Sequence, residues 1–434
     1  MTRIAAALTT FLLALAGVAP SAQADAACLN APTPDCLVAM AMEQRPQPSS
    51  AEDRAPLAYD LALVRALVRT AGPEAARAFG EASPHLSDAF RLDVALAHGL
   101  AAVGRADEAV AMTAAWKAEG REVAHVLTIA RHLGAGGHMN ALGTLMEIWR
   151  SDRDHDLIAQ YASQGLIEAG RPGAPELLLD TMASSDSPLP WVGEHVVSFV
   201  LAGQAEAALP VVRQMPPGSF KVSRLAMIAL ALNDPALAAE AEAEVMNIAD
   251  AASRAVARRY VAASRTIAGS EGDAMRDQVF KDEDERIATV ATVVAAMGTK
   301  AFTTRHMLDA MLRRIGNDEQ HDAAITRALY TIDVLMPLHP FWLDLIDRMR
   351  NGAKRDEILF SFIVRFARQR PDVIPDYAGR MSDQRSRARG FFWLARALAE
   401  RGDAVQVIAL LAAEDVGGPA QRGEVLLALA LHMP

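Results

Sequence analysis

Aromatic residues and cysteines are scarce in this chain, and both shortages restrict what it can be. The sequence has 434 residues, of which 5% are aromatic and 2 are cysteine. So few aromatics argue against a surface on which nucleic-acid bases stack. Two cysteines supply neither a disulfide-rich framework nor a four-cysteine zinc site. After the first residues, no apolar run reaches the roughly 20 residues that a membrane-spanning helix needs.

Familiar signatures of catalysis and metal binding are missing as well. The sequence contains no HExxH, no GxSxG and no Gly-Lys dipeptide, so it lacks the zinc-protease, serine-hydrolase and P-loop patterns. A calcium-like spacing of acidic residues begins at Asp152, but Leu157 stands where such a loop needs glycine. His132 and His138 flank a Gly-rich turn without a third ligand. We therefore predict no catalytic residue, no cofactor, no metal and no enzymatic activity.

The first residues have the pattern of a secretory signal peptide. Arg3 precedes an apolar run over 4–19, and the small-x-small sequence at 22–24 fits a signal peptidase site. We expect residues 1–24 to be removed and the remaining chain to be exported to the periplasm of a bacterium. Asp25 stands where a lipoprotein signal requires a leucine-like residue, so no lipid anchor is expected.

The two cysteines, Cys28 and Cys36, lie close together near the start of the mature chain. An oxidising compartment favours their closure into a disulfide. Loop entropy indicates about 2.5 kcal/mol of stabilisation from so short a ring. We assign residues 25–53 to an N-terminal segment that holds this disulfide and ends in a linker rich in Pro and Ser.

Turn signals recur along the rest of the chain at a mean spacing of about 33 residues, and each lies between two segments of helical periodicity. Hydrophobic residues make up 51% of the sequence, and the abundant alanine favours helices that approach closely. These features predict an all-α fold: a right-handed α-solenoid of about eleven antiparallel helix pairs over 54–413, followed by a capping helix in 414–434. The turn signals are Gly72, Gly104, Gly136, Gly170, Gly203, Asn233, Gly269, Gly298, Pro337, Arg370 and Gly402.

Small residues occupy two positions around several of these turns, seven before and five after. Ala97 with Ala109 and Ala226 with Ala238 fill both positions, and the stretch FFWLARALAERGDAVQVIALL at 391–411 fits best. In these features the chain resembles the tetratricopeptide-like family of helical repeats, whose paired helices touch at small residues. The resemblance implies a binding scaffold without catalysis of its own.

Several polar residues should begin helices. We expect Asp88, Asp154 and Ser253 to cap helix starts, and Asp234-Pro235 to place proline in a first helical turn. The five tryptophans lie mostly on apolar helical faces and are expected to pack between helices rather than to stack on a ligand.

Charge is distributed unevenly over a chain whose formal net charge is −10. An acidic exported chain without aromatics near its arginines is a poor candidate for nucleic-acid binding. Arginine binds carboxylates through two parallel hydrogen bonds, so the basic segment predicts capture of an anionic peptide, a wall polymer or a C-terminal carboxylate. Its arginines are Arg365, Arg368, Arg370, Arg380, Arg385, Arg387, Arg389 and Arg396. We predict that Arg380, Arg385, Arg387 and Arg389 contact the partner, with Arg385 and Arg389 on one helix face.

The function that fits these features best is a non-catalytic periplasmic scaffold that binds a protein or peptide of the cell envelope. A first alternative is a helical module that binds a cell-wall glycan or exopolysaccharide for a separate enzyme or export machine. A second is a hydrolase or lyase with an unrecognised carboxylate site. A groove rich in Asp, Glu and Trp would favour a glycan, and a groove with arginine and apolar pockets would favour a peptide.

Overall fold

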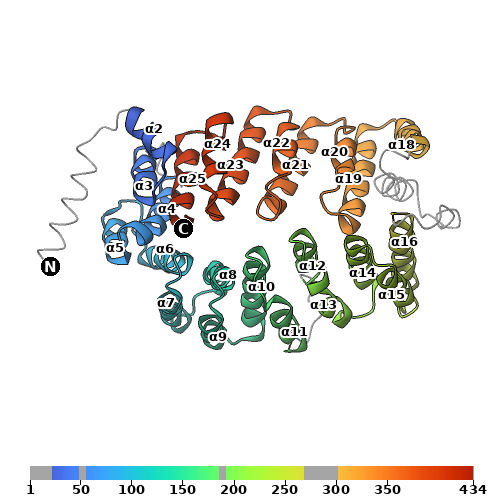
Figure 1. Ribbon diagram of the computed structural model, residues 1–434, viewed down its shortest axis with the longest axis horizontal. Coiled ribbons are helices and arrows are strands. Elements are labelled where there is room, and N and C mark those ends of the chain that lie inside the picture. The colour runs from blue at the N-terminus through green and yellow to red at the C-terminus, as the bar shows by residue number, and fades with distance from the viewer. Residues whose placement is uncertain (1–21, 48–54, 185–191, 268–301, 434) are drawn as a thin grey trace, which may run out of the picture. The chain divides into compact units, whose positions relative to one another are not determined.

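The structure, a computed structural model, describes residues 22–47, 55–184, 192–267 and 302–433 (Figure 1). Every regular element in these ranges is a helix, which confirms the all-α class. Most of the predicted signal peptide lies outside the described residues, as do the turn signals Gly269 and Gly298. None of the helices in the described ranges has the length and apolarity to cross a bilayer.

The chain divides into two compact units, which are treated separately. Unit 1 comprises Met1–Gly165, Phe362–Gly379 and Gln384–Pro434, and unit 2 comprises Leu166–Ser361 and Arg380–Asp383. The helices of unit 1 are α2 (Ala22–Asn30), α3 (Pro34–Glu43), α4 (Ala55–Thr70), α5 (Pro73–Ala82), α6 (Ala89–Ala102), α7 (Ala106–Ala118), a 3-10 helix (Val123–His125), α8 (Leu127–Gly136), α9 (Met139–Ile148), most of α10 (Asp152–Glu168), α22 (Ile374–Gly379), α23 (Gln384–Glu400), α24 (Ala404–Ala413) and α25 (Pro419–His432).

Unit 2 holds the middle of the chain and is helical throughout its described part. Its helices are α11 (Ala174–Ser184), α12 (Val192–Leu201), a 3-10 helix (Ala205–Ala208), α13 (Leu209–Gln214), α14 (Ser219–Leu232), α15 (Pro235–Val245), α16 (Ala251–Ile267), α18 (Phe302–Arg314), α19 (Asp318–Leu335), α20 (Phe341–Ile346) and α21 (Gly352–Phe366), whose last residues belong to unit 1.

The predicted turns separate helices where a residue adopts a left-handed backbone. Gly104 has φ 82°, Gly402 has φ 72° and Asn233 has φ 52°, a region that glycine enters freely and asparagine tolerates. In the turn at 134–137 the left-handed residue is Gly137, with φ 73°, and not the predicted Gly136, which still belongs to α8. The periodic turns therefore do end helices, with a shift of one residue at this place.

Helix caps were predicted with mixed success. Asp88 caps α6 by accepting the N–H of Phe90 at 3.0 Å, and Asp234 caps α15 in the same way. The predictions for Asp154 and Ser253 are wrong. Asp154 lies within the first turn of α10, where Ser151 caps its N–H, and Asp250 accepts the N–H of Ser253 at 2.6 Å.

The reason for both errors is local. A serine or aspartate one to three residues earlier in the chain reaches the same unsatisfied N–H groups at the positive end of the helix. Because the residue that precedes the first helical turn is better placed to bond them, it becomes the cap.

In unit 1, consecutive helices pack in a regular pattern of contacts. Helix α4 contacts α5 and α6, α6 contacts α7 and α8, and α7 contacts α9. Each first helix of a pair thus touches its own partner and the first helix of the next pair. The small residues predicted at such contacts, Ala97 and Ala109, are fully buried.

Helix α25, which was expected to cap the repeats, contacts helices from both ends of the chain. It packs on α23 and also on α3 and α4, so the last described helix lies beside two helices from the early part of the chain within unit 1 (Figure 1). The approach depends on a small residue, because a Cβ at Gly423 would collide with the hydroxyl of Tyr59. Tyr59 is itself fully buried and donates a hydrogen bond to the carbonyl of Ala41 in α3.

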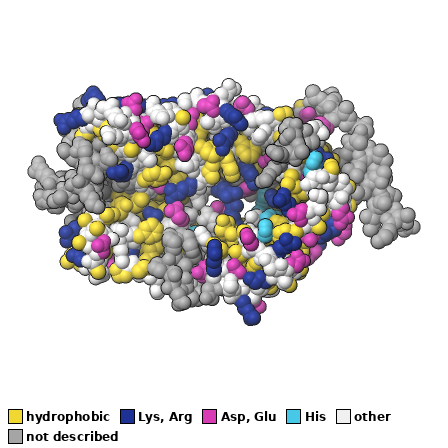
Figure 2. All heavy atoms as spheres, turned by 180° about the vertical axis from the view of Figure 1, so that it is seen from behind, with side chains coloured by type: hydrophobic (Ala, Val, Ile, Leu, Met, Phe, Trp, Pro, Cys, Tyr) yellow, Lys and Arg dark blue, Asp and Glu magenta, His cyan; other side chains and the backbone are white. Residues whose placement is uncertain are grey.

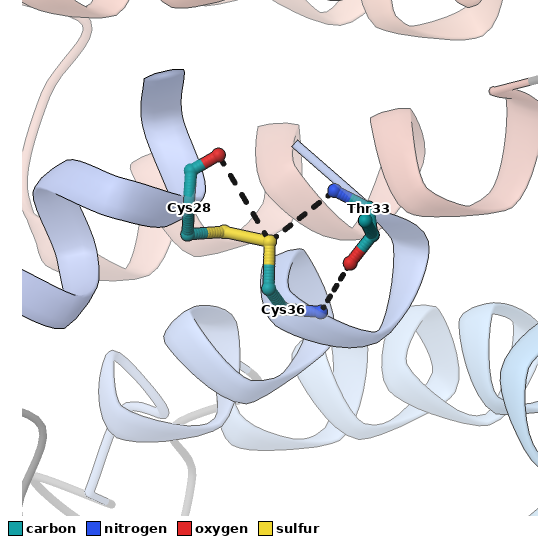
Figure 3. Close-up of a disulfide and its surroundings, with 3 residues drawn as sticks. All are labelled: Cys28, Thr33 and Cys36. Carbon is teal, nitrogen blue, oxygen red and sulfur yellow. Dashed lines mark hydrogen bonds between the residues drawn. A yellow bond between two sulfur atoms is a disulfide. The ribbon is translucent and has the colours of Figure 1, made fainter. Parts of the chain in front are cut away.

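The predicted disulfide is present and joins α2 to the first turn of α3 (Figure 3). Cys28 and Cys36 have Cα atoms 5.8 Å apart. Thr33 caps α3 by accepting the N–H of Cys36 at 3.3 Å, while its own N–H points to the sulfur of Cys36. The disulfide therefore fixes the start of the helix that packs against α25.

Unit 2 contains two buried aspartates that hold the starts of later helices, and we call them the aspartate joints, Asp322 and Asp356. Asp322 of α19 accepts the N–H groups of Arg350 and Asn351, both at 2.9 Å, just before α21. Asp356 of α21 accepts the N–H of Ser382 at 3.0 Å and that of Asp383 at 3.0 Å, just before α23. The two joints are 34 residues apart in the sequence and make the same connection.

Candidate functional site

A polar cavity of about 350 Å³ opens in unit 1 where α4, α6 and α8 meet α23 and α25. Leu61 and Ala62 of α4 face it together with Leu427 and Leu431 of α25, so one part of its wall is apolar. The charged and titratable side chains that line the rest define what we call the arginine cavity: Arg65, Arg131, Arg368, Arg396, Glu400, Glu424, His98, His132 and His432.

Close contacts between helix backbones fix the walls of this cavity. A Cβ at Gly165 of α10 would collide with the carbonyl of Arg131, so only glycine lets α8 and α10 approach there. Gly402, in the turn after α23, leaves room for the carbonyl of His432 at the end of α25. Packing of this kind holds side chains in one place more firmly than loops do.

Glu400, the last residue of α23, is the negative centre of the arginine cavity. Its carboxylate accepts the Nε and Nη2 hydrogen bonds of Arg368 at 2.7 and 3.2 Å and the Nε of Arg396 at 3.3 Å. Arg131 lies 3.7 Å from the same carboxylate. Burial disfavours the charged form, but the arginines outweigh it and lower the pKa of Glu400 to about 2.

Arg65 differs from the other three arginines. Its Nε is buried and has no hydrogen-bond partner. Burial, followed by the charge of Arg396, lowers its pKa to about 10, so the guanidinium remains charged at neutral pH. Glu424 is the second carboxyl of the cavity, and burial raises its pKa. The cavity therefore holds four arginines against two carboxyl groups.

The three histidines of the cavity are held in the neutral form. Burial is the main cause: it lowers the pKa of His98 to about 3 and that of His432 to about 4, and neighbouring arginines add to the effect. The pKa of His132 is also well below its ordinary value. The rings of His132 and His432 stack with their centroids 5.4 Å apart. With the histidines neutral, the arginines leave an excess of about two positive charges.

No group of three His, Cys, Asp or Glu side chains in the described ranges is arranged to hold a metal ion. His132, which the sequence places beside His138 at one turn, has its closest aromatic contact with His432 instead. His138 lies against Gly104, in the turn between α6 and α7. The two histidines therefore belong to different surroundings.

Of the four arginines predicted to bind a partner, Arg380 belongs to unit 2 and the other three to unit 1. Arg380 forms an ion pair with Asp347. Arg385, Arg387 and Arg389 lie in the first turns of α23 with exposed side chains. Figure 2 shows that on one face of the molecule basic and acidic side chains are interspersed with hydrophobic areas, so arginines on that face do not create a field of one sign.

Comparisons with protein-family models, with curated proteins and with solved structures found no match to this chain. The site must therefore be interpreted from its own geometry. Its arrangement is suited to holding an anion: four arginines and two carboxyl groups line it, the Nε of Arg65 has no hydrogen-bond partner, and the lining is partly open to water, with 21% exposure for Arg131 and 38% for Arg396.

Sequence reasoning identified two members of the cavity, Arg368 and Arg396, but only as part of a basic segment. It missed Arg65, Arg131 and both glutamates. One signal was available: Arg65 in LALVRALVRT and Arg396 in WLARALAE each interrupt an otherwise apolar helical face. A single arginine in such a place must reach water, a carboxylate or a ligand.

The tryptophans have the predicted role wherever their side chains are described as buried. Trp116, Trp149 and Trp342 are at most 3% exposed and pack between helices. Trp393 is half-buried, and Trp191 lies outside the described residues. None of the four described tryptophans lines the arginine cavity.

Proposed function

We propose that this chain is an exported, non-catalytic helical scaffold that captures an anionic group of a cell-envelope protein in the arginine cavity. The observation that carries the proposal is the excess of arginine over carboxylate in a cavity that water and ligands can enter. Buried like charges are unfavourable unless they are balanced, so an anionic partner gains affinity by supplying the missing negative charge.

The arrangement of the helices supports a tetratricopeptide-like solenoid as the framework. The contacts of α4, α6 and α8 follow the pattern expected when helix pairs stack in sequence. The aspartate joints repeat one connection after 34 residues, close to the spacing of the turn signals. We propose that the remaining pairs continue this repeat, and that the signal peptide delivers the chain to the periplasm, where Cys28 and Cys36 are oxidised.

The composition of the cavity favours a peptide over a glycan. Arginines and leucines line it, whereas glycan sites are generally built from carboxylates and exposed tryptophan, and no tryptophan is present here. Arginine also binds planar carboxylates more specifically than sugar hydroxyls. Glycan binding therefore remains the weaker alternative.

A hydrolase or lyase is a second candidate, favoured by one observation. The cavity holds a carboxyl of raised pKa, Glu424, and a carboxylate of lowered pKa, Glu400, a difference that acid–base pairs exploit. Against this role, the hydrogen bonds of two arginines already engage Glu400. If the chain were such an enzyme, Glu424→Gln would abolish turnover of an envelope polymer while leaving partner capture unchanged.

Site-specific photocrosslinking in the periplasm tests the main proposal. A photoreactive residue at Thr128, which is exposed at the cavity, should give a discrete adduct with one envelope protein. The matched probe at Val405, which is 81% exposed and does not line the cavity, should not. Equal adducts from both positions, or none from Thr128, would contradict capture at the cavity.

The arginines of the cavity and the exposed arginines of α23 must be tested separately, because the exposed ones remain a predicted partner site. We expect Arg368→Glu to abolish the Thr128 adduct and the double variant Arg385→Glu with Arg389→Glu to leave it intact. The opposite result would move the binding site to α23.

Mass spectrometry of the exported protein should find an N-terminus at Asp25, as predicted for the signal peptide.

A further inference from the structure

The arginine cavity has two unlike walls, and together they restrict the ligand. One wall carries the arginines, while the other is lined by the partly exposed Leu61 of α4 and by the largely buried Leu427 and Leu431 of α25. An inorganic anion would satisfy the first wall and leave the second without a partner. A ligand that fits both must carry its negative charge beside an apolar group.

The donors of the charged wall are not equally available. Arg368 and Arg396 direct hydrogen bonds to Glu400, and Arg131 faces the same carboxylate. Arg65 has a buried Nε with no hydrogen-bond partner, and it projects from α4 one helical turn from Leu61 and Ala62. The donor that still needs an acceptor therefore lies next to the apolar wall.

The surroundings of that donor favour a carboxylate over a phosphate. A guanidinium presents two parallel N–H groups that can pair with two oxygens of either anion. A phosphate carries further charged oxygens, which would lie against leucine side chains that offer them no hydrogen bond. The volume of about 350 Å³ is near the lower end of the range for ligand pockets, so the cavity admits a small acid or the end of a chain.

We propose that the arginine cavity is a binding site for a single carboxylate attached to an apolar group. The carboxylate binds Arg65, and the apolar group packs on Leu61 and Leu431. Because these residues come from α4 and α25, the ligand also ties the first helices of unit 1 to the last. The inference rests on the proposed function, since it names the anionic group that the cavity captures.

Two sources can present this chemistry, a free acid and the C-terminal residue of a protein. N-acetyl-leucine serves as the probe for the first, and an acetylated pentapeptide ending in leucine serves for the second. The same pentapeptide with a C-terminal amide is the control that keeps the apolar group and removes the charge. Binding is measured by calorimetry on the mature full-length protein, with its thermal midpoint as an independent readout.

We expect the free-acid peptide to bind at least tenfold more tightly than its amide and to raise the thermal midpoint. Arg65→Gln should remove this preference, and Arg65→Lys, which keeps the charge but loses the paired donors, should retain part of it. Leu61→Ala should weaken the leucine-ended peptide more than one that ends in alanine. Arg91→Gln, an exposed arginine of α6 that does not line the cavity, should change nothing.

Equal binding of acid and amide would overturn the inference, and so would displacement of N-acetyl-leucine by inorganic phosphate at a lower concentration. N-acetyl-leucine binding as tightly as the peptide acid identifies a free acid as the source, and a clear advantage for the peptide identifies a protein end. If both peptides bind equally but Arg368→Glu still abolishes the Thr128 adduct, carboxylate recognition fails while partner capture stands. If N-acetyl-leucine binds and no adduct forms, partner capture fails while the carboxylate site stands.

Discussion

The aspartate joints of unit 2 and the arginine cavity of unit 1 both remove charged side chains from bulk water, but they balance them differently. At each joint, one carboxylate accepts the backbone N–H groups that begin the next helix, so the charge is used within the fold. In the cavity, four arginines share two carboxyl groups, and Arg65 keeps an unbonded Nε. Burial of charge alone therefore does not mark a binding site; a buried donor beside a cavity that lacks an acceptor, such as the Nε of Arg65, does.

The largest effect should come from breaking a joint. Asp356→Ala removes the acceptor that the N–H groups of Ser382 and Asp383 share, on a side chain that is only 6% exposed. We expect the free energy of unfolding to fall by about 3 to 5 kcal/mol, measured by urea denaturation. Asp356→Asn, which keeps one acceptor oxygen, should lose about half as much. A loss below about 1 kcal/mol for Asp356→Ala would show that the joint is not structural.

A smaller loss is expected when the negative centre of the cavity is removed. Glu400→Gln takes away the carboxylate that three arginines share, and it should lower the free energy of unfolding by about 2 to 3 kcal/mol, because water in the cavity solvates part of the remaining charge. Added acetate should restore part of the loss, since it supplies a replacement carboxylate. Acetate should not rescue Asp356→Ala, and equal rescue of both variants would remove the distinction between cavity and joint.

Glu424→Gln is the matched control for that experiment. Burial raises the pKa of Glu424, so its charged form is not favoured by its surroundings. The substitution should therefore change the free energy of unfolding by less than about 1 kcal/mol. A loss as large as that of Glu400→Gln would show that both carboxylates balance the arginines equally.

Local sequence patterns predicted the local features of this fold. Periodic apolar residues and turn glycines such as Gly104 and Gly402 identified helices and their ends, because each depends on neighbours within one or two turns. The errors at Asp154 and Ser253 are also local: two polar residues competed for the same helix start, and the sequence did not decide between them.

The arginine cavity could not be predicted in this way, because its walls are far apart in the chain. Arg65 and Arg396 are separated by 331 positions and come together only because α25 packs on α3 and α4. No periodicity specifies that pairing. The basic segment around Arg385 was predicted as a partner site because its arginines lie close together in the sequence. The arginines of the cavity, in contrast, lie far apart in the sequence on apolar helix faces.

Lowering the pH tests the same contrast between the cavity and the aspartate joints through the histidines of the cavity, with a smaller expected effect on stability. The pKa of His98 is about 3 and that of His432 about 4 in the folded protein, against an ordinary value of 6.5. Between pH 6.5 and 4 the unfolded chain therefore takes up protons that the folded chain does not. The free energy of unfolding should fall across this window, by roughly 2 kcal/mol for each histidine at pH 5.

Urea denaturation from pH 7 to pH 4.5 measures this slope. The variant His432→Gln should flatten it. Glu400, whose pKa is about 2, adds a slope in the same direction as the pH approaches 4.5, because its carboxyl begins to take up a proton in the unfolded chain there. His195 of unit 2, with a pKa of about 4, adds a slope in the same direction, so the comparison must be made between variants. An unchanged slope in His432→Gln would mean that this histidine is protonated in the fold, and the excess positive charge would then be larger.

The smallest change in stability should accompany Arg65→Gln. Arg65 contributes to the excess of positive charge and its Nε bonds nothing, so removing its charge should leave the free energy of unfolding unchanged or raise it by up to about 1 kcal/mol. Arg368→Gln, which breaks two hydrogen bonds to Glu400, should instead lower it by about 1 to 2 kcal/mol. A loss for Arg65→Gln as large as that for Arg368→Gln would place Arg65 with the aspartates of the joints, as a residue that the fold itself requires. A charge that serves to bind a ligand can lower the stability of the protein without its ligand. A stable Arg65→Gln variant that no longer binds a carboxylate would therefore separate the buried charge of the binding site from the buried charges of the aspartate joints, which the fold requires.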